Sequence, residues 1–336
     1  MLRALMQNTR LPLLLLLFTA ACGASSEATK DPATPASGSS AGSPDEAADP
    51  SATNVDVFSF GWKVPCRVPV LRVSEKRGKT AKMRFFVAAR PAKNDRIEVR
   101  VEGTEFLEID GEDATTPEAQ EKLAPVLPLL SMPVPMIISA EGEYLEAREL
   151  DQVIERLLAT PAITKNPKLS AFMAQALRSP QMQAQLAASV GDAWNSWVGA
   201  WIGLSNSPGE VVEADDVVPA GAEKVPVRMR FEHHGKVQGD DALVRVSITQ
   251  TLAGEKAEQG LANLLREVAG PHFPKDMPIE NLRRITRTEA ETDPRTLRPR
   301  HVRFEQTVDL TMGGKSQSTR EFKDDTFDWS RAEGCR

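Results

Sequence analysis

The sequence predicts an α+β protein, a curved antiparallel β-sheet with helices packed on one face. Segments near both ends of the folded part alternate apolar and charged residues with a period of two. This pattern is typical of strands with one buried face, and such strands usually form antiparallel sheets. Helical patterns lie between these segments. Strands before and after a helical region favour helices that pack together on one face of the sheet.

The first strands are predicted from alternation around residues 83–87 and 97–102. Met83, Phe85 and Val87 alternate with basic residues, and residues 97–102 repeat the pattern with Arg and Glu. The pair Glu141-Gly142 then predicts a hairpin turn, because glycine accepts the backbone angles that tight turns need.

Helices are predicted over residues 149–158, 168–178, 181–204 and 261–268. The second is bounded by Pro167 and Pro180, because proline is accepted in the first turn of a helix and disfavoured in its interior.

The C-terminal third is predicted to be sheet. Residues 225–232, 244–249 and 302–312 alternate in the same way, and Gly313-Gly314 predicts a hairpin turn into residues 316–327.

Three tryptophans give the most prominent local pattern of the folded part. Trp194, Trp197 and Trp201 fall on one arc of the predicted helix 181–204, and Asp192 falls on the opposite arc. Ordinary core packing of the three rings, an apolar ligand cavity and contact with a membrane interface are all compatible with this stripe. We keep the three tryptophans as candidate ligand-binding residues.

The N-terminus has the features of an export signal. Arg3 and Arg10 flank an apolar run over residues 11–18, which is shorter than the roughly 20 residues that a membrane span needs. Small residues at positions 19–21 precede Cys22. This arrangement resembles the lipobox of bacterial lipoproteins, in which the cysteine is lipidated, with acyl chains such as palmitate, and becomes the mature N-terminus.

The resemblance implies a signal peptide over residues 1–21 and a lipid anchor on Cys22. Residues 22–54 are rich in Ala, Ser, Pro and Gly, and we expect a disordered linker with a span of roughly 30 Å. The α+β domain is expected over residues 55–336. It could consist of two similar halves, about 55–160 and 205–336, with the helical segment between them.

The expected location is the cell envelope, with lipid anchoring to the membrane. Gly23 after the anchor favours the outer membrane, because Asp at this position favours inner-membrane retention in enteric lipoproteins. The net charge of -6 argues against nucleic acid as a partner. An apolar ligand or another envelope protein remains a possible partner.

Cys66 and Cys335 lie near the two ends of the folded part and are predicted to form a disulfide. Disulfides persist in exported proteins, and domain termini often lie close together. No Cys/His spacing in the chain suggests a metal or redox centre.

We recognise no catalytic centre, no cofactor site and no metal site in the sequence. His233 and His234 are adjacent in a predicted strand and would point to opposite faces, so they could not share a metal ion. The sequence therefore predicts a non-enzymatic protein with a binding or structural role. The alternatives are a carrier or sensor of an apolar ligand held between the sheet and the tryptophan-bearing helix, and an enzyme of unrecognised type.

One further segment supports the carrier alternative. Residues 293–299, with the sequence DPRTLRP, connect two predicted strands. They resemble the strand-connecting turns of periplasmic lipoprotein-carrier proteins, whose curved half-barrels hold acyl chains.

Overall fold

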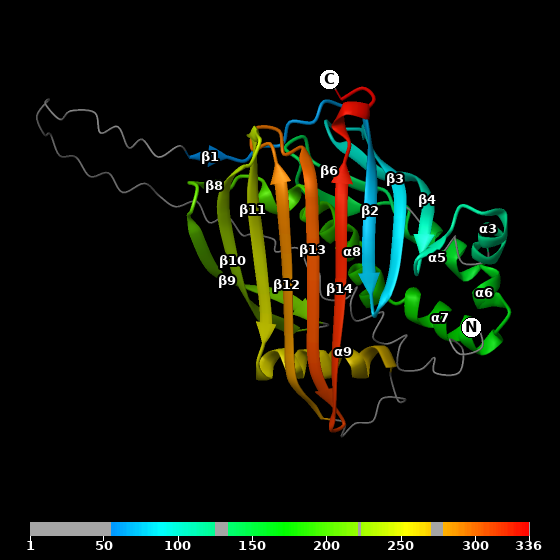
Figure 1. Ribbon diagram of the computed structural model, residues 1–336. Coiled ribbons are helices and arrows are strands. Elements are labelled where there is room, and N and C mark those ends of the chain that lie inside the picture. The colour runs from blue at the N-terminus through cyan, green and yellow to red at the C-terminus, as the bar shows by residue number, and fades with distance from the viewer. Residues whose placement is uncertain (1–54, 125–133, 221–222, 270–277, 336) are drawn as a thin grey trace, which may run out of the picture.

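The strands predicted near both ends of the folded part join one large antiparallel sheet (Figure 1). The computed structural model describes residues 55–124, 134–220, 223–269 and 278–335. The first six strands of the sheet are β2 (Cys66–Lys76), β3 (Lys79–Pro91), β4 (Ile97–Ile109), β5 (Glu112–Asp113), β6 (Met136–Ile138) and β7 (Tyr144–Ala147). The other six are β9 (Val211–Ala220), β10 (Glu223–Val237), β11 (Asp240–Ala253), β12 (Ile279–Thr292), β13 (Pro299–Met312) and β14 (Lys315–Phe327).

The strand order is β7-β6-β4-β3-β2-β14-β13-β12-β11-β10-β9, with β5 paired to β4. The first and last parts of the chain meet where β2 pairs with β14, for example at Val70 and Phe327. Residues 55–160 and 205–336 therefore contribute to one continuous sheet, and the similarity of the two halves stays a prediction.

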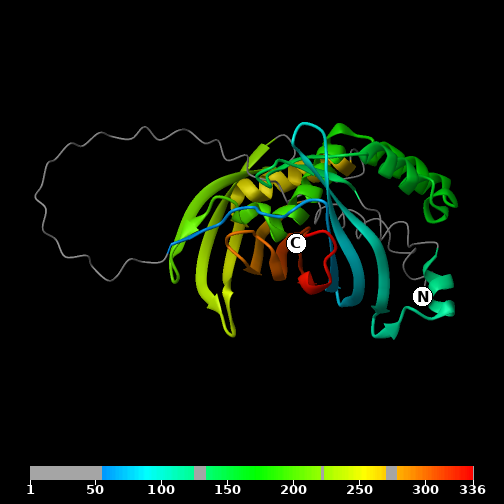
Figure 2. The same cartoon turned by 90° about the horizontal axis from the view of Figure 1, so that it is seen from above.

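Seen from above, the sheet forms an open arch, and α8 (Pro180–Trp197) and α9 (Glu255–Ala269) lie on its concave side (Figure 2). The predicted α+β class, with a curved antiparallel sheet and helices on one face, is confirmed. The remaining helices are α3 (Pro117–Leu123), α5 (Leu150–Leu158), α6 (Pro161–Thr164), α7 (Pro167–Leu177) and the short 3-10 helices η1 (Gly199–Trp201) and η3 (Trp329–Arg331).

Helix boundaries agree with the sequence where proline marks them. Helices α7 and α8 begin at Pro167 and Pro180. Helix α9 begins six residues before the predicted start, at Glu255. Its first turn contains Glu255 and Glu258, which stabilise a helix N-terminus through the helix dipole. Because these residues are charged, they do not add to the apolar periodicity from which the helix was predicted.

The prediction of one amphipathic helix over residues 181–204 was wrong in its C-terminal part. Helix α8 ends at Trp197, and the backbone of Val198 leaves helical geometry with φ -139° and ψ -54°. Trp201 therefore belongs to η1. The break turns the chain so that Trp201 packs near Phe231 of β10, with ring centroids 6.2 Å apart.

The concave face contains two buried apolar clusters. One surrounds α8 and η1 at the end of the sheet that carries the disulfide, and includes Val68 of β2 and Val246 of β11. The other lies under α9, where Leu261 packs with Val227 of β10 and Val308 of β13.

The chain enters the domain at the end of the sheet that carries the disulfide, and contacts there fix the entering segment. Strand β1 (Asp56–Val57) pairs with β8 (Ser205–Asn206) in a separate two-stranded sheet. The carboxylate of Asp56 lies 2.9 Å from Nε2 of the buried His233. Because Nδ1 of His233 accepts a hydrogen bond from the backbone of Gly235, Nε2 carries the proton and donates to Asp56.

Candidate binding site on the concave face

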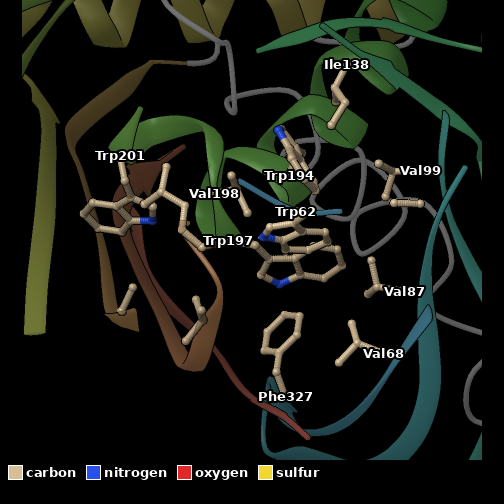
Figure 3. Packing of buried hydrophobic residues seen from close by; sticks show 14 of the residues in the cluster. Trp62, Val68, Val87, Val99, Ile138, Trp194, Trp197, Val198, Trp201 and Phe327 are labelled. Atoms are coloured by element: carbon tan, nitrogen blue, oxygen red, sulfur yellow. Dashed lines mark hydrogen bonds between the residues drawn. The ribbon is translucent and has the colours of Figure 1, made fainter. Parts of the chain in front are cut away.

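The tryptophans singled out in the sequence lie in a closely packed group that we call the aromatic layer (Figure 3). Its members are Trp62, Trp194, Trp197, Trp201 and Phe327. Trp62 and Trp194 meet edge to face with centroids 5.4 Å apart, and Trp197 meets Phe327 at 5.7 Å. Trp194, Trp197 and Trp201 are each no more than 2% exposed. The structure thus places all three predicted site residues in the core, and their role in ligand binding stays a prediction.

Hydrogen bonds fix the indoles of Trp62 and Trp194 in the aromatic layer. Trp62 donates to the carbonyl of Leu297 at 3.1 Å, and Trp194 donates to the carbonyl of Gly142 at 2.7 Å. Gly142 has φ +91° and lies against Phe60, so a side chain at this position would clash with that ring. The predicted turn at Glu141-Gly142 therefore also anchors α8.

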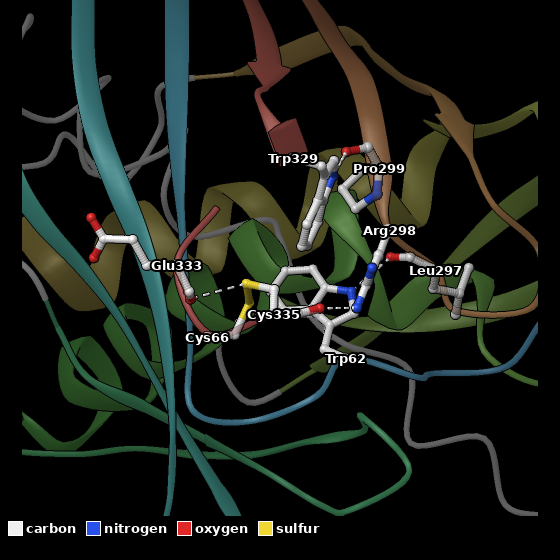
Figure 4. The surroundings of a disulfide bond; sticks show 8 residues. All are labelled: Trp62, Cys66, Leu297, Arg298, Pro299, Trp329, Glu333 and Cys335. Atoms are coloured by element: carbon white, nitrogen blue, oxygen red, sulfur yellow. Dashed lines mark hydrogen bonds between the residues drawn. A yellow bond between two sulfur atoms is a disulfide. The ribbon is translucent and has the colours of Figure 1, made fainter. Parts of the chain in front are cut away.

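The predicted disulfide between Cys66 and Cys335 is present beside this layer (Figure 4). It ties the first residue of β2 to the segment after η3, with the two Cα atoms 4.6 Å apart. Backbone hydrogen bonds between Arg67 and Glu333 hold the same two segments together. Trp329 packs edge to face on Trp62 at 5.1 Å, so this end of the concave face is closed by covalent and aromatic contacts.

Charged side chains occupy the concave face next to the aromatic layer. Asp325 of β14 accepts two hydrogen bonds from Arg72 of β2, at 2.6 and 2.7 Å. The same carboxylate accepts the indole N–H of Trp197 at 2.8 Å, which places it on the face that α8 covers. Because side chains alternate along a strand, Lys323 and Glu321 lie on this face as well.

Two lysines share one carboxylate in this region. Glu321 lies 2.9 Å from the ammonium of Lys76 and 2.8 Å from that of Lys323. Burial opposes ionisation of Glu321, but the charges of Lys323 and Lys76 prevail and lower its pKa. The lysine side chains remain 35% and 39% exposed, so solvent reaches them.

Asp192 of α8 faces the same region from the helix side. Burial raises the pKa of Asp192 from 3.8 to about 8, against the opposing charges of Arg284 on β12 and Lys323 on β14. Burial, followed by the charges of Asp192 and Glu146, also raises the pKa of Tyr144 to about 12. The sequence placed Asp192 on the helix arc opposite the tryptophans. The side of α8 that carries Asp192 is thus covered as well.

We call this group of charged residues the ionic patch. Its members are Arg72, Lys76, Asp192, Arg284, Glu321, Lys323 and Asp325. Apolar side chains border it. The ring of Phe304 on β13 lies 4.9 Å below the ammonium of Lys323, and Met83 on β3 pairs with Arg72. Both Phe304 and Met83 are only partly buried.

Sequence reasoning missed the ionic patch, although one signal was available. Lys323 and Glu321 have the same parity along β14 as the buried Phe327. A charged residue at a position expected to be buried indicates an internal ionic group or a site, whereas residues 316–327 were predicted only to be sheet after the hairpin turn.

The arginine-rich stretch of residues 283–303 is divided between the two faces. Arg284 is buried on the concave side, whereas Arg287 and Arg303 lie on the convex side with Glu289 and Glu305. These four convex residues line a shallow hollow of about 170 Å³. Their charges cancel in pairs, which leaves no strongly basic surface there.

A second hollow, of about 580 Å³, lies at the turn between β3 and β4. Arg90, Lys93, Glu98 and Arg148 contribute to its lining. It is open to solvent, and its lining includes none of the predicted site residues.

The other predicted features are located as follows. His233 is buried and His234 is exposed, as their adjacent positions on a strand predict. Among the described residues, no group of three or more His, Cys, Asp or Glu side chains could hold a metal ion. Within the same part of the chain, no helix is long and apolar enough to cross a membrane. Cys22 and the linker lie outside the described residues.

No family model matches the chain, and no curated protein matches it. A solved structure titled "Lipid-protein interactions in lipovitellin" is similar with a TM-score of 0.40 and 8% sequence identity. The similarity covers 83% of this chain and 26% of the lipovitellin chain, so this chain spans about a quarter of that protein. The assignment of a site therefore depends on the residues of this chain alone.

Proposed function

We propose that the chain is a lipid-anchored envelope protein that binds an acyl-chained molecule on the concave face of its sheet. The supporting observation is the partly exposed ionic patch beside the half-buried side chains of Phe304 and Met83. Charged groups on a buried face cost free energy unless they are paired or serve a ligand. A concave surface that mixes apolar walls with a few polar groups is typical of ligand sites.

The sheet provides the shape that such a ligand needs. It curves around α8 and α9 without closing on itself (Figure 2), and we propose that the ligand contacts this inner surface. The aromatic layer closes one end and the apolar cluster under α9 closes the other. The ligand would lie between them, along β14, β13 and β2.

Anchoring is proposed to occur through Cys22. The linker joins the domain at β1, whose Asp56 is fixed to His233. Mass spectrometry of the mature N-terminal peptide should show a lipidated Cys22, and Cys22→Ala should release the protein from membranes. An unmodified terminus would contradict the anchor and leave the binding site untouched.

Native mass spectrometry of protein extracted from its own membranes tests the binding site. We expect a noncovalent acyl-chained molecule, in addition to the covalent anchor, that is lost on denaturation. A clean apo mass would favour a purely structural envelope role instead.

A pair of matched variants locates the ligand. Phe304 lies on the concave face under Lys323, and Phe322 lies on the convex face under Arg303, each 4.9 Å from the cation. Phe304→Ser should reduce the bound fraction several-fold, whereas Phe322→Ser should retain it. An equal loss in both variants would place the ligand elsewhere.

A further inference from the structure

A row of neutral polar side chains crosses the concave face between its two apolar clusters. In the register of the sheet, Gln250 of β11 lies opposite Thr286 of β12, and Thr286 lies opposite Gln306 of β13. Residues directly opposite each other on antiparallel strands point to the same face, with Cβ atoms about 5 Å apart. The three side chains therefore form one continuous line, which we call the polar row.

The polar row lies on the boundary between the two clusters. On β11, Gln250 is flanked on the same face by Ile248 of the first cluster and Leu252 of the second. On β13, Gln306 precedes Val308 of the second cluster by two residues. Neutral hydrogen-bonding groups thus stand between two apolar clusters, where a ligand with both polar and apolar parts can be held.

Gln306 has unused hydrogen-bonding capacity. The residue is 7% exposed, and its Oε1 accepts a hydrogen bond from the hydroxyl of Thr286 at 3.3 Å. Among the described residues, no acceptor lies within hydrogen-bond distance of its Nε2. This nitrogen is not fully enclosed, unlike the unpartnered Nε1 of Trp201, so a ligand atom can reach it. Because buried polar groups in native proteins nearly always have a partner, Nε2 of Gln306 indicates where a ligand acceptor would lie.

The free donor lies beside the apolar surface proposed for the acyl chain. Phe304 precedes Gln306 by two residues on β13, so both side chains point to the concave face. The ring of Phe304 is only partly buried, which leaves surface for a ligand. An acyl chain that covers this ring can therefore bring its polar end to Nε2 of Gln306.

We infer that the ligand is an acyl ester, whose carbonyl oxygen accepts a hydrogen bond from Nε2 of Gln306 while its chain covers Phe304. This inference rests on the proposed function and names the chemical class of the ligand. An ester carbonyl supplies an acceptor and no donor, which matches an amide nitrogen with two available N–H groups. A carboxylate would also accept these bonds, but burial of a charge costs more free energy than burial of a neutral carbonyl.

Three probes with chains of the same length test the inference on the mature protein. They are the ester 1-dodecanoylglycerol, its ether analogue 1-O-dodecylglycerol, which lacks the carbonyl, and dodecanoate. Each is titrated by calorimetry below the concentration at which it aggregates. We expect the ester to bind about fivefold more tightly than the ether, as one neutral hydrogen bond provides. Dodecanoate should bind more weakly than the ester.

Gln306→Met removes the amide and keeps a side chain of similar volume. It should abolish the preference for the ester and retain binding of the ether, which also shows that the variant is folded. Gln238→Met is the control, because Gln238 is exposed in the turn between β10 and β11, and it should keep the preference.

The outcomes separate the ester contact from the acyl-binding site. Equal binding of ester and ether to the parent protein would overturn the ester contact and leave the acyl-binding site in place. Tighter binding of dodecanoate than of the ester, or the same loss of preference in Gln238→Met, would do so as well. Binding of none of the three probes would overturn the proposed function.

Discussion

Two neighbouring regions of the concave face, the aromatic layer and the ionic patch, differ in chemistry although strands β2 and β14 contribute to both. In the aromatic layer, large rings are buried, most of their N–H groups have fixed acceptors, and a disulfide ties the chain ends beside them. In the ionic patch, two lysines share one carboxylate, remain partly exposed, and adjoin half-buried apolar side chains. The comparison shows that one sheet can combine a closely packed, buried region with a partly exposed ionic group, where we propose that the ligand binds.

Removal of the disulfide beside the aromatic layer should have the largest effect on stability. The bridge spans 269 residues of sequence, and in the chain-entropy model its loss lowers the free energy of unfolding by up to about 5 kcal/mol. Urea denaturation of Cys66→Ser/Cys335→Ser should show this loss, with an unchanged fold by circular dichroism. In mature chains whose Cys22 is lipidated, two free thiols per chain, titrated under denaturing and non-reducing conditions, would contradict the pairing.

Truncation of a ring in the aromatic layer should have the next largest effect. Trp194→Ala should lower the free energy of unfolding by about 3–5 kcal/mol, because it leaves a cavity and an unpaired carbonyl at Gly142. Phe304→Ala, at the edge of the ionic patch, should cost clearly less, because its ring is already partly exposed. Equal losses, measured by denaturant titration, would remove the contrast between the two regions.

Replacement of Asp192 should change how stability depends on pH. The folded state raises the pKa of Asp192 from 3.8 to about 8, so between these values the native protein holds a proton that the unfolded chain has lost. This group therefore lowers the free energy of unfolding as pH rises through that window.

Asp192→Asn should become more stable relative to the parent as pH rises. The gain between pH 5 and pH 8 should reach up to about 4 kcal/mol, because one pKa unit corresponds to about 1.4 kcal/mol. Denaturant titrations at both pH values measure it. A difference between the two proteins that does not vary with pH would show that Asp192 is ionised throughout.

The smallest effect is expected on the convex face. Arg287 is about half exposed and pairs with Glu289 at 3.1 Å. Arg287→Ala should change the free energy of unfolding by less than about 1 kcal/mol, because exposed ion pairs contribute little. A larger loss in thermal melting would show that the convex charges stabilise the curved sheet.

Local patterns in the sequence predicted most of the fold. Period-two alternation identified parts of β3, β4, β10, β11 and β13, and Gly313 and Gly314 marked the hairpin between β13 and β14, where both residues have positive φ. The pairing of β2 with β14 could not be read in this way, because it joins segments about 250 residues apart and depends on the tertiary arrangement.

Less of the candidate site than of the fold could be predicted from the sequence. The tryptophan stripe identified residues of the core, but the break at Val198 separates Trp201 from α8. The ionic patch combines Asp192 from a helix with Arg284 and Lys323 from strands β12 and β14. Each is an ordinary charged residue in the sequence, and only the curvature of the sheet under α8 brings them together.

Photo-crosslinking tests the central claim, that an acyl chain lies on the concave face, most directly. The mature protein is irradiated with a fatty acid that carries a diazirine in its chain, and the adducts are mapped by tandem mass spectrometry. We predict adducts on concave residues of β3 and β13, among them Met83 and Phe304, that excess unlabelled fatty acid suppresses. Adducts confined to convex residues such as Phe322, or adducts that the competitor leaves unchanged, would contradict the claim.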